Sequence, residues 1–203
     1  MPSGGVLIIA AILGMIVCIL LGLGMPTTAA YTIVALLVAP VYVNEFFLPE
    51  LASHFFVFYA AILAGLTPPI ATCVAVASGI AKSGFWKTCA EAIKIAGPLW
   101  IIPFSFLYHP YFVDGNFSSA TLILAGIILV GSVSVIYGLN YPFTYRTHTN
   151  LLFRTFFVVF GAITIVHPST YIQALGIGAV IVLTALHRSS TFIKPKAISK
   201  EGV

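Results

Sequence analysis

The chain has 203 residues, of which 60% are hydrophobic and 7% charged, and its mean hydropathy is +1.10. Because a soluble domain normally carries charge on about a quarter of its residues, this composition excludes an ordinary soluble protein. The net charge of +4 is ascribed to orientation in a membrane and not to binding of nucleic acid.

Several stretches lack Asp, Glu, Lys and Arg over a length that fills a bilayer, since a spanning helix needs ~20 apolar residues. They are residues 1–44, 51–81, 95–113, 115–145 and 155–187. The sequence therefore predicts an all-α integral membrane protein that folds as a polytopic helical bundle.

The first stretch is interrupted at its middle by small, turn-forming and hydroxyl residues, namely Gly22, Gly24, Pro26, Thr27 and Thr28. Glycines end helices and proline suits the first turn of a new one. We expect one helix over 8–21 and a second that ends near Val38, before Ala39-Pro40. Arms of about 17 residues or fewer fall short of a full span, and the turn carries no basic residue. Residues 1–43 are therefore predicted to form a re-entrant helical hairpin, with a short turn between two spans as the alternative.

A second interruption, Gly65-Leu66-Thr67-Pro68-Pro69, lies within the next stretch. Proline removes a backbone donor and clashes with the preceding turn, so a tandem pair is expected to unwind the helix. We expect a helix from about Leu51 to Ala64 and a new half-helix from Pro69 or Ile70. Residues 44–84 are thus predicted to form a proline-broken transmembrane helix.

The remaining chain is predicted to hold an amphipathic segment with a following span, residues 85–112, and accessory transmembrane helices with a basic tail, residues 113–203. All basic residues then fall on one face, in the order Lys82, Lys87, Lys94, Arg146, Arg154, Arg188, Lys194, Lys196 and Lys200. The positive-inside rule makes this face, and with it the C-terminus, cytoplasmic.

Two such breaks indicate a transporter. In discontinuous helices the positive N-terminal ends of half-helices face anionic groups, and freed carbonyls and threonine hydroxyls coordinate Na⁺. Uncharged oxygen ligands suit this cation. Helices kinked for packing alone are the alternative.

At these residues the chain resembles the large membrane subunit of TRAP (tripartite ATP-independent periplasmic) transporters. "GLGMPTTAAYTIVALLVAP" is similar to the tip and second arm of the second re-entrant hairpin of that family. "HFFVFYAAILAGLTPPIATCVAVASGIAKSG" is similar to its last broken helix. The P-T-T-A-A-Y form and the H-x-F-V-F-Y lead-in look most like the TAXI-type subgroup of fused permeases. The resemblance covers roughly residues 8–112.

Two positions depart from the family pattern. Pro26 stands where related permeases often carry an acidic residue, and Tyr59-Ala60-Ala61-Ile62 replaces a frequent Asn-x-Glu. The chain also matches only the second of the two inverted halves of the family. It is therefore expected to be the C-terminal half of a permease, a fragment or one piece of a split system.

The resemblance implies a membrane permease component of a secondary active, Na⁺-coupled transporter that imports an organic acid (a carboxylate). It implies an elevator mechanism in which residues 1–43 and 44–84 move as a transport domain. The location would be the cytoplasmic (inner) membrane of a bacterium or archaeon. The expected partners are a periplasmic substrate-binding protein, the N-terminal half of the permease, a small membrane subunit or its fused equivalent, and the lipid bilayer. The expected Na⁺- and substrate-binding residues are Gly22, Gly24, Thr27, Thr28, Gly65, Thr67 and Pro68.

A non-transporting structural or assembly subunit, or a truncated permease fragment, is the alternative function. An enzyme is not expected, because no Asp or Glu lies within a predicted span and the histidines are scattered. No cofactor is expected, and Na⁺ is the expected coupling ion. Cys18, Cys73 and Cys89 are interpreted as small buried hydrophobic residues and not as a disulfide framework or metal site.

Overall fold

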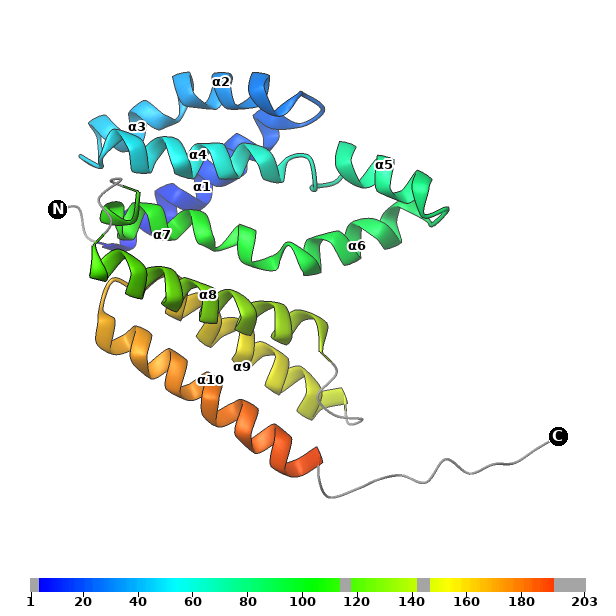
Figure 1. Cartoon of the computed structure of the whole chain (residues 1–203). Coiled ribbons are helices and arrows are strands. Elements are labelled where there is room, and N and C mark those ends of the chain that lie inside the picture. The colour runs from blue at the N-terminus through cyan, green and yellow to red at the C-terminus, as the bar shows by residue number, and fades with distance from the viewer. Residues whose placement is uncertain (1–3, 114–117, 142–146, 192–203) are drawn as a thin grey trace.

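The computed structural model describes residues 4–113, 118–141 and 147–191, and every regular element within them is a helix. In Figure 1 the helices α1–α7 form the upper part of the molecule, and α8–α10 form the lower part. The prediction of an all-α fold is confirmed in this coarse form. The predicted basic tail beyond residue 191 and Arg146 lie outside the described residues.

The interrupted first stretch forms an antiparallel helical hairpin. α1 (Gly4–Gly22) is the first arm, and α2 (Thr27–Leu37) with α3 (Ala39–Asn44) is the second. The second arm continues through Pro40, because this proline lies in the first turn of α3, where a missing N–H costs no hydrogen bond. The predicted arm length is therefore wrong: the arms have 19 and 18 residues. Arm length by itself does not separate a re-entrant hairpin from two spans.

α4 (Glu50–Leu63) lies at the centre of a core formed with α1, α2, α3 and α7. Phe56 and Ala60 on this helix are fully buried. Tyr42 of α3 packs its ring against Phe56, with centroids 5.1 Å apart, and its hydroxyl donates to the Ala10 carbonyl at 3.0 Å. Because a buried hydroxyl needs a partner, this bond ties the second arm to the first within an apolar core.

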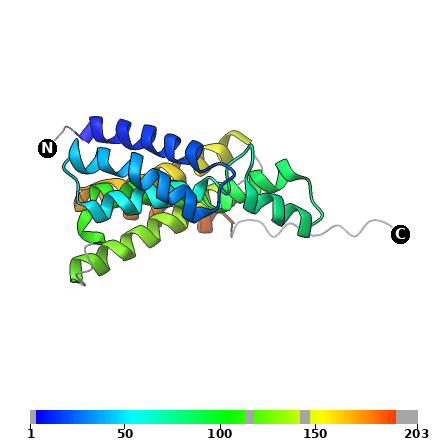
Figure 2. The same ribbon diagram turned by 90° about the horizontal axis from the view of Figure 1, so that it is seen from above.

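α5 (Thr72–Ile80) and α6 (Phe85–Ile95) form a shorter hairpin, which projects beyond the turn between α1 and α2 in both views (Figures 1 and 2). The chain then bends by 72° between α6 and the helical segment that follows. That segment consists of η1 (Gly97–Trp100) and α7 (Ile102–Tyr108), and η2 (Pro110–Phe112) comes after it. α7 packs against α4 and so connects the end of this part to its core.

α8 (Ser119–Asn140), α9 (Thr147–Val166) and α10 (Thr170–Thr191) form a three-helix unit. The Ser134 hydroxyl of α8 donates to the Phe157 carbonyl of α9 at 2.9 Å. The unit packs against α6, η1 and α7. It therefore packs on helices that follow the two breaks in the chain.

The described residues contain two helical segments long and apolar enough to cross a membrane, Thr27–Asn44 and Ser119–Asn140. The bent pair of α6 with η1–α7 makes a third if it is counted as one span. Large apolar side chains such as Ile9, Leu20 and Leu129 are exposed on α1 and α8. Exposed apolar surface of this extent is typical of a surface that lipid covers.

Candidate functional site

The first part of the site is the hairpin tip, Leu23–Pro26, which connects α1 to α2. Gly24 has φ +76°, a left-handed conformation that glycine adopts without a steric penalty. The Met25 N–H donates to the Gly22 carbonyl at 3.3 Å and closes the turn. Pro26 is the N-cap residue of α2, so the first N–H groups of that helix lie beside the tip.

The second part is the helix break, Ala64–Ala71, which separates α4 from α5. Ala71 has φ 41° and ψ 58°, a left-handed conformation that is incompatible with a helix, although its side chain is fully buried. This residue explains why α5 starts at Thr72 and not at Pro69 or Ile70 as predicted. The break itself agrees with the position that the tandem prolines predict.

Hydrogen bonds close the break into an ordered turn. The Thr67 hydroxyl donates to the Leu63 carbonyl at 2.6 Å, and the Thr67 carbonyl accepts from the Ala71 N–H at 3.1 Å. The Gly65 carbonyl accepts from the Cys73 N–H at 3.1 Å, which ties α5 back to the start of the break. The Thr67 oxygen has given its hydrogen to Leu63, but it retains lone pairs that can accept a cation.

The tip lies directly against the break. A Cβ atom on Gly22 would lie 2.9 Å from the Ala64 Cβ and 3.3 Å from the Ala61 carbonyl oxygen. A Cβ atom on Gly24 would lie 3.2 Å from Cδ1 of Ile70. At Gly22 the neighbouring atoms cannot move aside on a flexible side chain, so the close approach requires glycine there. The two interruptions, with 37 residues between them in the chain, are therefore one site.

The predicted residues divide into two groups at this site. Gly22 and Gly24 contact the break, and Gly65, Thr67 and Pro68 belong to it and are half-buried. Thr27 and Thr28 are exposed on the first turn of α2, and no hydrogen bond of the described residues connects them to the break. The Thr28 carbonyl accepts from the Thr32 hydroxyl at 2.9 Å.

The site brings together groups that suit a small ionic ligand. The N-terminal ends of α2 and α5 carry partial positive charge, and they flank the two turns. Backbone carbonyls and the Thr67 oxygen supply uncharged acceptors beside them. This arrangement can bind an anionic group at a helix end and a cation at the oxygens.

The sequence did not predict a further contact, which connects α2 to α4. The Tyr31 hydroxyl lies 2.9 Å from Nδ1 of His54, and the Tyr31 ring packs edge-on against Phe58 with centroids 5.3 Å apart. Both residues belong to the motifs quoted above, P-T-T-A-A-Y and H-x-F-V-F-Y. Their separation of 23 residues follows no helical period, so the sequence contains no signal for their pairing.

The prediction that all three cysteines are buried is wrong for one of them. Cys18 and Cys89 are buried, but Cys73 is exposed. The reason is that Cys73 lies on the first turn of α5, a helix whose buried face consists of Val74 alone. An exposed thiol therefore lies beside the break.

A known family matches the segment that contains this site. The family described as "Tripartite ATP-independent periplasmic transporter, DctM component" matches residues 1–113. No curated protein and no solved structure matches the chain. The matched segment includes both the tip and the break, whereas α8, α9 and α10 lie outside it.

Proposed function

We propose a specific transport role for this chain, which belongs to the family of the DctM component of tripartite ATP-independent periplasmic transporters. The family consists of transporter permeases and not of enzymes, and its match covers more than half of the chain. The apolar helices agree with a multi-pass inner-membrane protein. Within this family role, we propose secondary active uptake of an organic acid (a carboxylate), coupled to Na⁺ and dependent on a periplasmic binding protein.

The contact between the tip and the break is the observation that carries the proposal. Gly22 and Gly24 approach Ala64 and Ile70 so closely that the two turns form a single site. In transporters, paired discontinuous helices bind the coupling ion with freed carbonyls and hydroxyls, and they face the anion with helix N-termini. In this chain the Thr67 oxygen is the side-chain ligand that we propose for Na⁺.

The proposed topology places the basic residues in the cytoplasm. Lys82 and Lys87 lie at the turn from α5 to α6, and Arg154 lies beside the C-terminal end of α8. These helix ends are on one side of Figure 1, together with the C-terminal end of α10. The positive-inside rule then puts this side and the C-terminus in the cytoplasm. The tip carries no charge, which supports a re-entrant hairpin.

The proposed working unit contains more than this chain. We propose that it supplies the C-terminal half of a TAXI-type permease and that it works with the N-terminal half and a small membrane subunit or its fused equivalent. α1–α5 would then form the moving transport domain of an elevator. The three-helix unit packs on α6, η1 and α7, which supports a place for α8–α10 outside that domain.

The exposed thiol of Cys73 allows a test that needs neither the substrate nor the partners. The full chain in membrane vesicles is treated with a water-soluble maleimide, in NaCl or in choline chloride at equal ionic strength. Since Cys18 and Cys89 are buried, alkylation reports on Cys73 beside the break. We expect Na⁺ to slow alkylation, because a cation bound at the break would fix the turn to which the Cys73 N–H is bonded, and with it the thiol that lies beside Gly65.

Variants of threonine distinguish the effect of the Thr67 hydroxyl on Na⁺ binding from an effect on folding. Thr67→Val removes the oxygen but leaves the Leu63 carbonyl bonded to the Leu66 N–H, at 3.0 Å. We expect the Na⁺ concentration for half-protection to rise about tenfold or more, the loss of ~1.4 kcal/mol of binding, whereas Thr67→Ser retains protection. Thr88→Val is the matched control, since Thr88 also donates to the carbonyl four residues earlier but lies in α6.

Two results would count against the proposal. If Thr67→Val and Thr88→Val show the same Na⁺ dependence, the Thr67 hydroxyl is not a ligand. If Na⁺ does not change alkylation of the unaltered chain, the two breaks serve packing alone. The alternative of a structural or assembly subunit, or of a truncated permease fragment, would then replace Na⁺-coupled transport.

A further inference from the structure

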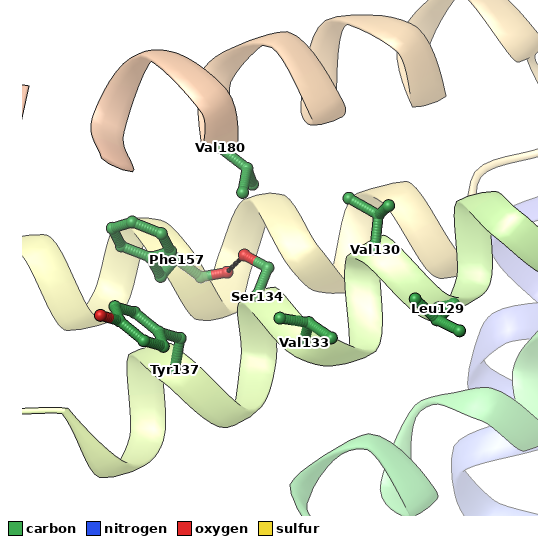
Figure 3. A pocket seen from close by; sticks show the side chains of 7 residues that line it. All are labelled: Leu129, Val130, Val133, Ser134, Tyr137, Phe157 and Val180. Carbon is green, nitrogen blue, oxygen red and sulfur yellow. Dashed lines mark hydrogen bonds between the residues drawn. The ribbon is translucent and has the colours of Figure 1, made fainter. Parts of the chain in front are cut away.

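The three-helix unit contains an apolar groove with a volume of about 450 Å³. Figure 3 shows its position between α8 and α10, with α9 behind it. Leu129, Val133 and Tyr137 form one wall along α8, and Val180 of α10 lies opposite. The lining is almost wholly apolar, so the groove is suited to a hydrocarbon chain and not to an aqueous solute.

The floor of the groove offers no free hydrogen-bond donor to a solute. Its serine, Ser134, already donates its hydroxyl hydrogen to the Phe157 carbonyl at 2.9 Å (Figure 3). In contrast, the wall residues Leu129 and Val133 are 64% and 55% exposed. These side chains lie on a helix of spanning length. The groove therefore opens on the surface that faces the bilayer, where acyl chains are the available apolar ligand.

One end of the groove carries positive charge. Arg154 is three residues before Phe157 on α9, so it lies about one helical turn from the floor. Its Nε donates to the Gly138 carbonyl at 3.0 Å, and its Nη2 donates to the Leu139 carbonyl. These bonds hold the guanidinium at the C-terminal end of α8 and use two of its five N–H groups. Within the part of the chain that the structure describes, the other three N–H groups donate to no further acceptor.

Among the described residues, Arg154 forms no ion pair with a carboxylate. Residues 115–200 contain six basic residues and no Asp or Glu. The rings of Tyr137 and Tyr141 stack at the same end of α8, with centroids 4.6 Å apart. Amphipathic rings of this kind are typical of the membrane–water interface, where lipid headgroups lie.

We propose that this groove binds one acyl chain of an anionic phospholipid whose headgroup lies at Arg154. The apolar lining accommodates the chain, but a hydrocarbon chain has little to gain over the surrounding bilayer. The headgroup therefore determines the selectivity. A basic residue near the membrane surface favours an anionic lipid by about fivefold, which corresponds to ~1 kcal/mol.

The test measures which lipid the full-length chain retains after purification. Detergent-solubilised protein is incubated with equal amounts of phosphatidylglycerol and phosphatidylcholine that carry the same acyl chains. Bound lipid is then counted by native mass spectrometry. We expect about fivefold more phosphatidylglycerol than phosphatidylcholine on the unaltered chain.

Two pairs of variants locate the lipid. Val133→Trp fills the groove, and Leu122→Trp is its control, because Leu122 is similarly exposed at 65% on α8 but does not line the groove. We expect Val133→Trp to lose most of the bound lipid and Leu122→Trp to retain it. Arg154→Gln should reduce the preference for phosphatidylglycerol to near unity, and Arg154→Lys should preserve it.

Three outcomes would overturn the proposal. Equal retention by Val133→Trp and Leu122→Trp would show that the lipid binds elsewhere. Equal binding of the two lipids to the unaltered chain would show that Arg154 does not select an anionic headgroup. A dimer that dissociates only in Val133→Trp would identify a second copy of the chain as the occupant. If Arg154→Gln does not fold, Arg154→Lys and the tryptophan pair still decide the question.

Discussion

The substitution Gly22→Ala tests the contact between the hairpin tip and the helix break. Gly22 is the last residue of α1, and the Cβ of an alanine there would lie 2.9 Å from the Ala64 Cβ and 3.3 Å from the Ala61 carbonyl oxygen. Ordinary carbon–carbon contacts are ~3.5–4.0 Å. Neither neighbour is the end of a flexible side chain, so the tip has to withdraw from the break.

The expected magnitude follows from two opposing effects. Overpacking of a closely packed position costs ~1–3 kcal/mol. Replacement of glycine by alanine in a helix recovers up to ~1 kcal/mol, and less at a helix end. We therefore expect Gly22→Ala to weaken the closed arrangement by ~1–2 kcal/mol, a factor of about 5–30 in its equilibrium constant.

Alkylation of Cys73 measures this change. If the closed arrangement binds Na⁺, the Na⁺ concentration for half-protection should rise about 5- to 30-fold in Gly22→Ala. Gly126→Ala is the matched control: Gly126 lies inside the helix α8, and its added Cβ would meet nothing within 4 Å. This variant should keep the Na⁺ dependence of the unaltered chain.

The reasoning is refuted if Gly22→Ala and Gly126→Ala give the same half-protection concentration. That result would mean that the close approach of the tip to the break has no bearing on Na⁺ binding. A rise in alkylation of Gly22→Ala in both NaCl and choline chloride, without a shift in the Na⁺ dependence, would also separate packing from ion binding.

Three further predictions concern polar contacts away from the site. Tyr31→Phe should lower the unfolding free energy by ~0.5–1.5 kcal/mol, because it removes the hydrogen bond to His54. In a His54→Ala background the same substitution should have no further effect, and additive losses of stability in thermal unfolding would disprove the pairing. Tyr42→Phe should lower Tm by about 2–4 °C, because it breaks a buried bond between the hairpin arms, and an unchanged Tm would contradict that role. The Lys94 ammonium donates a hydrogen bond to the Glu91 carboxylate and thereby lowers the pKa of Glu91. The ionised Glu91 therefore stabilises the fold above the ordinary pKa of a glutamate, and this stabilisation disappears as the pH falls through the lowered pKa. The Tm difference between Glu91→Gln and the unaltered chain should accordingly shrink on acidification. A difference that widens would contradict the lowered pKa of Glu91.

Local signals in the sequence were sufficient to place the elements. The turn at Gly22 to Pro26 and the break at Gly65 to Pro69 lie where the glycines and prolines predict them. The limits of the helices were less predictable. Pro40 lies in the first turn of α3 and does not end the second arm, and the left-handed Ala71 delays the start of α5. These limits depend on how the backbone packs, and the residue types alone do not specify it.

The sequence by itself determined the membrane class through its charge-free runs, and the family through the match over residues 1–113. It also determined the positions of both breaks, because prolines and glycines act on the backbone within a few residues. Only the tertiary structure decided that the tip lies on the break, that Tyr31 pairs with His54 and that α8 and α10 leave a groove. These contacts join residues from different helices. They depend on which helix faces pack together, and several packings of apolar helices satisfy the same sequence pattern.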